Sequence, residues 1–464
     1  MVDEKKVKSF KLRLPETATL LVLIILIMAM LTYIVPAGRF QRAVDEATGR
    51  TLVVPGTFAY MDQTPVGFMS LLSSVYRGMV GATEIMSFIF VVGGVFGILT
   101  KTGAITAALG SLIKKFQGRE NILIIIIMTA FAAGGMSYGM GEEVIPFVTI
   151  LVPIAIKMGY DPIVGVSMVV VALYSGYSAG PLNPFNTGVA QGICQLPLFS
   201  GIGIRTVLGI GALAIAIEHT LRYGNKYKKS RLGEIGSHEI QFAEERPVNS
   251  TDRLILVILI VTIIVLVFGV LKYEWYFTDI AGLFMLMGIV IGLIYFKGNL
   301  EECINEFMVG TKDIAVAAIL VSLSRAILVV MEEGNIADTM IYWMSIPLSS
   351  MNNIFAAWGM YLSQGFVNFL IPSSSGQAVV VMPIMSSLSD LIGVSRQTAV
   401  LAFQSGDGFW NMITPTHPIL MASLGLAGVS FSKWFKFSFW LVVKWSIWVI
   451  IILTYATLTN LGPF

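Results

Sequence analysis

Three carboxylates and one histidine lie in segments that are otherwise apolar, where ionisable side chains are expensive. Glu142 and Glu143 are neighbours in the first half of the chain, and Asp407 and His417 lie near its end. A charge at the bilayer centre costs about 2.5 to 3.5 kcal/mol on insertion scales, so such residues are usually functional. They can pair with a cationic solute or hold a coupling ion. Alternatively, one glutamate caps a helix, and local backbone N–H groups satisfy Asp407.

Small polar residues and helix breakers surround these four side chains, and together they form the candidate site. The candidate substrate-binding residues are Ser137, Tyr138, Gly141, Glu142, Glu143, Asn183, Asn186, Thr187, Ser373, Ser374, Ser375, Gly376, Asp407, Asn411, Thr414 and His417. The candidate ligands of a coupling ion are Ser175, Asn183, Asn186, Ser405, Asp407 and Asn411. We expect no catalytic residue, because no nucleophile stands beside a base, and no metal site, because no paired metal-ligand pattern is visible. The coupling ion, if one is used, would be Na⁺ or H⁺; no other cofactor is expected.

The composition indicates a membrane protein. Of 464 residues, 56% are hydrophobic and 12% are charged, and the mean hydropathy is +0.80. These values exclude an ordinary soluble enzyme. The formal net charge of +2 gives no reason to expect nucleic acid as a partner.

Apolar runs predict an all-α polytopic fold with about nine transmembrane helices, two re-entrant hairpins and two broken helices. The runs long enough to span a bilayer lie near 17 to 36, 84 to 101, 163 to 195, 204 to 222, 253 to 271, 280 to 297, 314 to 331, 396 to 424 and 434 to 458. The runs 163–195 and 396–424 contain Gly and Pro at mid-length, so we expect each to be a broken helix. The segments 120–157 and 352–389 each have a polar tip between two apolar arms, as a hairpin would.

The distribution of Lys and Arg predicts the orientation. If both hairpins return to the side they entered from, basic clusters near 114–119, 222–231 and 433–436 all fall in the cytoplasm, as the positive-inside rule requires. The amino terminus is then inside and the carboxyl terminus outside. We expect a first repeat over 1–224, a cytoplasmic linker over 225–250 and a second repeat over 251–464.

The two halves repeat one another in sequence. Ser175-Gly176 recurs as Ser405-Gly406 and Pro153-Ile154 as Pro383-Ile384, both at an offset of 230 residues. Five predicted crossings separate equivalent points, and because five is an odd number the halves are expected to be inverted. Inverted repeats with discontinuous helices are typical of secondary transporters. An ATP-driven pump is not indicated, because no nucleotide-binding motif is present.

The tip and break sequences resemble the C4-dicarboxylate anaerobic carrier family, in its YfcC-like branch, within the ion transporter superfamily. The motifs are Gly141-Glu142-Glu143, the run from Asn183 to Ala190, the run from Pro372 to Ala378, and the run from Phe403 to Gly408. The resemblance implies an elevator-type or alternating-access carrier, a homodimer, and a multi-pass location in the bacterial cytoplasmic membrane. It implies C4-dicarboxylates or basic amino acids of the arginine and ornithine type as solutes. His417 departs from the small polar residue expected there.

The acidic candidate site favours a cationic amino acid. Glu142, Glu143 and Asp407 would repel a doubly negative dicarboxylate unless sodium ions or protons neutralised them. Sodium- or proton-coupled transport of a C4-dicarboxylate is therefore the alternative, and an ion channel is the alternative of another class. Arg325 lies inside an apolar run, where it either pairs with Glu332 or Glu333 or binds a substrate carboxylate.

Overall fold

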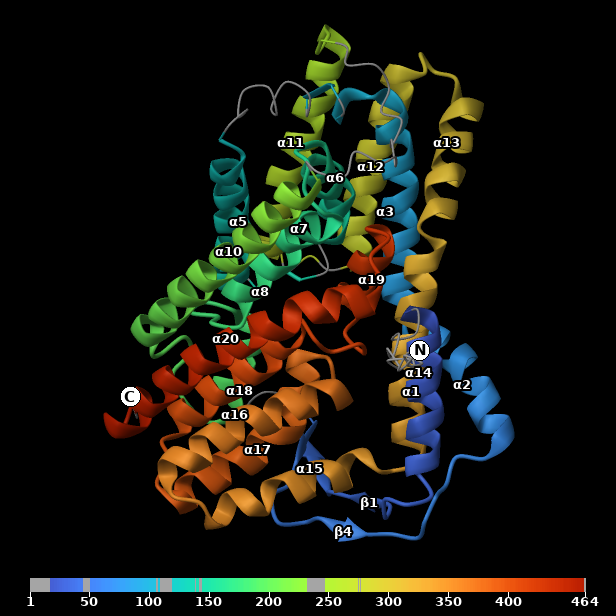
Figure 1. Cartoon of the computed structure of the whole chain (residues 1–464). Coiled ribbons are helices and arrows are strands. Elements are labelled where there is room, and N and C mark those ends of the chain that lie inside the picture. The colour runs from blue at the N-terminus through green and yellow to red at the C-terminus, as the bar shows by residue number, and fades with distance from the viewer. Residues whose placement is uncertain are drawn as a thin grey trace, which may run out of the picture.

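The computed structural model is a largely helical assembly in which two groups of helices meet near the middle of the molecule (Figure 1). It describes residues 17–44, 51–105, 107–108, 119–137, 139–141, 144–231, 247–273, 275 and 277–462. Both groups draw helices from both halves of the chain. Segments far apart in the sequence therefore build each group.

The first helix group packs around α14 and α3. Its members are α1 (Thr17–Leu31), α2 (Phe68–Gly81), α3 (Thr83–Thr102), α11 (Ser250–Tyr273), α12 (Phe277–Tyr295), α13 (Leu300–Asp313) and α14 (Ala315–Glu333). Helices α1 and α2 pack on α14, and α12 and α13 pack on α3. Single residues, Ala82 and Ile314, separate α2 from α3 and α13 from α14.

The second helix group contains both predicted hairpins and both predicted broken helices. Its members are α5 (Glu120–Ser137), α6 (Ile145–Lys157), α7 (Pro162–Val166), η2 (Ser167–Val171), α8 (Ala172–Tyr177), η3 (Pro184–Gly188), α9 (Val189–Ile193), α10 (Ile202–Arg231), α16 (Asn353–Leu370), α17 (Ser374–Ile392), α18 (Arg396–Trp410), α19 (Pro418–Leu426) and α20 (Phe431–Leu458). The long helices α10 and α20 pack along one another. Helices α5 and α6, and α16 and α17, correspond to the arms of the two predicted hairpins, while the breaks lie between α8 and η3 and between α18 and α19.

Residues 32 to 67 connect α1 to α2 and contain strands that the sequence analysis did not predict. Strand β1 (Gly38–Arg39) pairs with β4 (Ala59–Tyr60), and β2 (Arg42–Val44) pairs with β3 (Thr51–Val53), both antiparallel. They lie with α15 (Ala337–Ser345) and the short helix η4 (Pro347–Ser350) at the end of the molecule drawn lowest in Figure 1. The fold is thus helical with two small sheets at one end.

Most predicted apolar runs coincide with helices to within a few residues. Among the described residues six helices are long and apolar enough to span a membrane: α3, α5, α10, α12, α17 and α20. The sequence analysis missed α2, α13 and α15, which carry charged or polar faces and so give no continuous apolar run. The number of crossings and the re-entrant course of the hairpins stay predictions.

Close glycine contacts occur at matching places in the two halves. Gly176 of α8 packs on α5, where a Cβ would lie 2.0 Å from the carbonyl oxygen of Ala132. Gly406 of α18 packs on α16, where a Cβ would lie 2.6 Å from the carbonyl oxygen of Tyr361. Gly406 follows Gly176 at the offset of 230 residues found in the sequence, so these two equivalent positions make the same kind of close helix contact.

Candidate functional site

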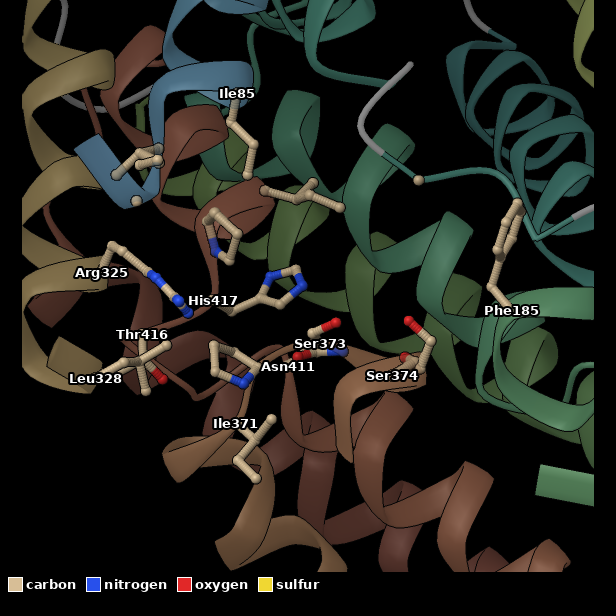
Figure 2. Close-up of a pocket in the computed structure, with 18 of the residues that line it drawn as sticks. Ile85, Phe185, Arg325, Leu328, Ile371, Ser373, Ser374, Asn411, Thr416 and His417 are labelled. Atoms are coloured by element: carbon tan, nitrogen blue, oxygen red, sulfur yellow. The ribbon is translucent and has the colours of Figure 1, made fainter. Parts of the chain in front are cut away.

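A cavity of about 300 Å³ lies where the two helix groups meet. Its walls come from the end of α2 and the start of α3, from the glycines Gly139 and Gly141 after α5, from α8, from α14, from the tip between α16 and α17, and from the start of α19. Figure 2 shows Ser373 and Ser374 across the cavity from Arg325, with His417 between them. The tip of the second predicted hairpin and the break of the second predicted broken helix therefore face one cavity.

The amino terminus of α17 forms one polar wall of this cavity. Ser373 is the N-cap residue, and its hydroxyl accepts a hydrogen bond of 3.4 Å from the backbone N–H of Gly376. Ser373, Ser374 and Ser375 all line the cavity. A helix amino terminus carries free backbone N–H groups and partial positive charge, which favour a carboxylate. This wall is suited to the anionic end of a solute.

Asp407 lies directly behind that wall and connects the two halves. Its Oδ2 atom accepts hydrogen bonds of 2.5 Å from the hydroxyl of Ser374 and from the side-chain amide of Asn186. The hydroxyl of Tyr177 donates in turn to Ser374 at 2.9 Å. Asp407 and Asn186 are 1% and 0% exposed. One hydrogen-bond network thus joins Asn186 of the first broken helix, Asp407 of the second and Ser374 at the tip of the second hairpin.

Two oxygens of this network, Oδ1 of Asp407 and Oδ1 of Asn186, have no hydrogen-bond partner among the described residues. The buried hydroxyl of Ser405, on the same helix as Asp407, also has none there. Burying an acceptor without a partner costs roughly 1 to 3 kcal/mol, so unpaired buried oxygens normally have a further ligand. Oxygen atoms of this kind fit the coordination of Na⁺ at a helix break.

His417 restarts the second broken helix as an N-cap. Its Nδ1 atom accepts a hydrogen bond of 3.2 Å from the backbone N–H of Leu420. Its Nε2 atom lies 2.8 Å from the hydroxyl of Tyr174. In the first broken helix Asn183 has the same place, accepting from the backbone N–H groups of Phe185 and Asn186 at 2.9 and 3.2 Å. His417 thus caps the helix as the small polar residue expected at this position would.

The structure brings part of the predicted site together. The cavity-lining residues among them are Gly141, Ser373, Ser374, Ser375, Asn411 and His417. Asp407 lies one hydrogen bond behind Ser374, and Asn186 lies one further hydrogen bond behind Asp407. Gly139, which precedes Gly141, lies against Asn183. Three predicted residues, Tyr138, Glu142 and Glu143, lie outside the described residues.

The remaining predicted residues are occupied within their own surroundings. The hydroxyls of Ser137, Ser175 and Thr414 donate to backbone carbonyls one turn earlier, at Ala133, Ala172 and Trp410. The hydroxyl of Thr187 lies 2.8 Å from the carbonyl oxygen of Gly180 and 3.0 Å from the side-chain oxygen of Gln404, so its one proton is shared between the two acceptors. Gly376 contributes the backbone N–H that is capped by Ser373. None of these five lines the cavity.

The sequence analysis missed Tyr174, Gln404 and Arg205. Arg205 is 0% exposed and donates to the side-chain oxygens of Gln404 and Gln397, each at 2.8 Å, and to the carbonyl of Ser200 at 2.5 Å. Gln404 donates to the carbonyl of Ala179 in the first break. An arginine inside the apolar run 204–222 was the available signal, since a buried guanidinium must be paired with acceptors.

The fold and the cavity define a multi-pass membrane protein with a polar site built from helix breaks and a hairpin tip. Within this class, the model of the C4-dicarboxylate anaerobic carrier family, DcuC, matches residues 14–458. The chain belongs to this family, which consists of transporters, and the resemblance stated from the sequence is confirmed.

Two relatives match nearly the whole chain. The Escherichia coli (strain K12) protein named "Putative basic amino acid antiporter YfcC" is 32% identical, over 91% of this chain and 92% of its own length. A protein of Haemophilus influenzae (strain ATCC 51907 / DSM 11121 / KW20 / Rd), described as an uncharacterized protein, is 27% identical over 94% and 95%. The first of these agrees with the YfcC-like branch expected from the motifs.

Solved structures are more remote. The YdaH transporter of Alcanivorax borkumensis is 15% identical, with a TM-score of 0.43, over 97% of this chain and 100% of that chain. The MtrF structure of Neisseria gonorrhoeae, whose title describes a class of antimetabolite efflux pumps, is 16% identical, with a TM-score of 0.39, over 95% of both chains. Likeness at this level carries no argument about mechanism.

Proposed function

We propose that this protein is a secondary carrier of small carboxylate-bearing solutes, with basic amino acids of the arginine and ornithine type preferred, working by exchange or ion coupling. The observation that carries the proposal is the cavity between the helix groups, which has a helix amino terminus on one wall and the first hairpin tip on another. A solute with separated anionic and cationic ends fits such a cavity. The name of the Escherichia coli relative supports the same solute class.

The carboxylate of the solute would lie at the amino terminus of α17. The hydroxyl of Ser375 and the backbone N–H groups of the first turn supply donors there. The hydroxyl of Ser374 already donates to Asp407 and therefore holds this wall in place. Backbone donors and a helix dipole bind an anion without adding a mobile charge.

The cationic end would pair with the acidic tip of the first hairpin. Gly139 and Gly141 line the cavity, and Glu142 and Glu143 follow Gly141 directly in the chain. Charge-assisted hydrogen bonds between a guanidinium or ammonium group and a carboxylate are among the stronger polar contacts. This pairing would select basic amino acids over neutral ones.

Counterflow uptake in liposomes tests the proposal. Liposomes that contain the purified protein and are loaded with unlabelled ornithine should accumulate labelled arginine. Liposomes with the variant Glu142→Gln/Glu143→Gln should lose most of this uptake. Retained arginine transport in the double variant would exclude the assigned role of the two glutamates. Parallel uptake of succinate identifies a dicarboxylate carrier.

A second candidate is sodium- or proton-coupled transport of a C4-dicarboxylate, the solute class in the family's name. The unpaired buried oxygens of Asp407 and Asn186 favour it, because a coupling cation would satisfy them. Succinate uptake driven by an imposed sodium or proton gradient, and lost in Asp407→Asn, would support this candidate. Indifference of uptake to both gradients would count against ion coupling.

We also propose a homodimer in the bacterial cytoplasmic membrane. Family membership and the six apolar helices support a multi-pass membrane location. The relative in Escherichia coli supports the assignment to a bacterial membrane. Native mass spectrometry of the detergent-purified protein tests the oligomeric state. A monomer under conditions that preserve transport would exclude the dimer as a requirement.

A further inference from the structure

Arg325 reaches the cavity from the first helix group, on the wall opposite the hairpin tip. Helices α2 and α14 approach closely at Gly78, where a Cβ would lie 2.6 Å from the carbonyl oxygen of Ser322. One turn later Gly81 ends α2, and its Cβ position is 3.1 Å from Nε and 3.3 Å from Cγ of Arg325. The arginine side chain therefore lies across a glycine surface that directs it into the cavity.

The guanidinium has few partners for its five donors. Among the described residues the one carboxylate within 4 Å is Glu332, with an Nη2 to Oε1 distance of 3.7 Å, which is too long for a hydrogen bond. Its Nε atom is buried and has no acceptor among the described residues. Glu333 is not available, because it pairs with Arg77 at 2.8 Å. An arginine with an unpaired buried Nε and a guanidinium directed at a polar cavity is suited to an anionic ligand.

We propose that Arg325 binds the carboxylate of the transported solute, opposite the amino terminus of α17. Figure 2 shows its guanidinium pointing across the cavity toward His417 and Ser373. A planar guanidinium can hold a carboxylate through two parallel hydrogen bonds, while the serines and helix N–H groups hold it from the other side. The inference rests on the proposed function only in requiring that the solute carries a carboxylate.

This assignment has a consequence for how the solute connects the two helix groups. Arg325 belongs to α14 of the first group, and Ser373 and Ser374 belong to the hairpin tip of the second. A carboxylate between them contacts both groups at once. The alternative role of Arg325 is to pair with Glu332 and fix the end of α14, and this role does not involve the solute.

Ligand binding to the purified full-length protein separates the two roles. We would measure the affinity for arginine, for agmatine, which lacks the carboxylate, and for succinate in wild type, Arg325→Gln, Arg325→Lys and Glu332→Gln. We expect Arg325→Gln to weaken arginine binding at least about tenfold, Arg325→Lys to weaken it less, and Glu332→Gln to leave it unchanged or tighter. Agmatine binding should be weak in wild type and unaffected by Arg325→Gln. Monodisperse elution and an unchanged melting temperature are required of each variant.

The outcomes separate the inference from the proposed solute. Equal arginine affinity in wild type and Arg325→Gln, or equal losses in Arg325→Gln and Glu332→Gln, would overturn the inference while leaving the carrier of basic amino acids in place. Succinate binding without arginine binding, weakened in Arg325→Gln, would overturn the preferred solute and support the inference. Binding of none of these compounds by wild type would overturn both. If Arg325→Gln does not fold, Gly81→Val, which displaces the guanidinium, must give the same selective loss, and full arginine affinity in that variant overturns the inference.

Discussion

At the scale of single residues, the two broken helices restart by the same device with different side chains. Asn183 precedes Pro184 and His417 precedes Pro418, and each side chain accepts hydrogen bonds from the backbone of the helix that follows. Because Nδ1 of His417 accepts from Leu420, the proton of the neutral ring is on Nε2 and is directed to the hydroxyl of Tyr174. The imidazole is thereby fixed at the cavity wall.

Substitution of His417 tests the capping role. We expect His417→Ala to destabilise the protein by about 1 kcal/mol or more through loss of the cap, and His417→Asn to retain most of the stability, because asparagine is among the best N-cap residues. Thermal unfolding of the purified variants measures both. An equal loss of stability in the two variants would show that the packing of the ring against Tyr174, and not the cap, is what matters.

At the scale of elements, close contact between hairpin arms and broken helices positions the site. Gly176 and Gly406 allow α8 and α18 to approach α5 and α16 at backbone distance. The same two helices, α8 and α18, carry Tyr177 and Asp407 to the hairpin tip. Small residues at a helix interface permit this approach, as is general in membrane proteins.

A methyl group added at one of these contacts should therefore be costly. We expect Gly406→Ala to destabilise the protein by roughly 1 to 3 kcal/mol, because its Cβ would lie 2.6 Å from a backbone carbonyl that cannot move freely. The matched control is Gly282→Ala in α12, where no atom lies within 4 Å of the added group. The melting temperature should fall for the first variant and stay level or rise for the second. A tolerated Gly406→Ala would refute the rigid contact.

At the scale of the whole molecule, the cavity lies between two helix groups that meet through α14 and α19. The hydroxyl of Ser324 on α14 donates to the carbonyl of Pro415, just before α19, at 3.0 Å. The two opposite sides of the cavity thus belong to different helix groups. Each group combines helices from the two halves of the sequence. This arrangement is suited to a site that is exposed alternately by movement of one group against the other.

Solute flux should consequently have the kinetics of a carrier. In liposomes we expect saturable uptake that is accelerated by solute on the opposite side, because each cycle requires a conformational change that a bound solute completes. Planar bilayers containing the same preparation should show no unitary currents. Conductance steps from the reconstituted protein would support a channel and contradict alternating access.

The sequence by itself determined the helical class, the position of most apolar helices, the two interruptions in the long apolar runs, and the family. These features are local: an apolar run of about 20 residues, a glycine or proline inside it, and a short motif can be recognised without knowing what they contact. The same locality explains the misses, since α2, α13 and the strands at 38 to 60 have no continuous apolar run.

Only the tertiary structure decided which polar residues share a site. Asn186 and Asp407 are 221 residues apart and form one hydrogen bond, and Arg325 enters the cavity because two glycines of α2 lie against α14. Ser137, Ser175 and Thr414 have suitable side chains, but a neighbouring carbonyl satisfies each of them. The physical reason is that a residue's type gives its hydrogen-bonding capacity, whereas packing between distant segments determines which partner uses that capacity.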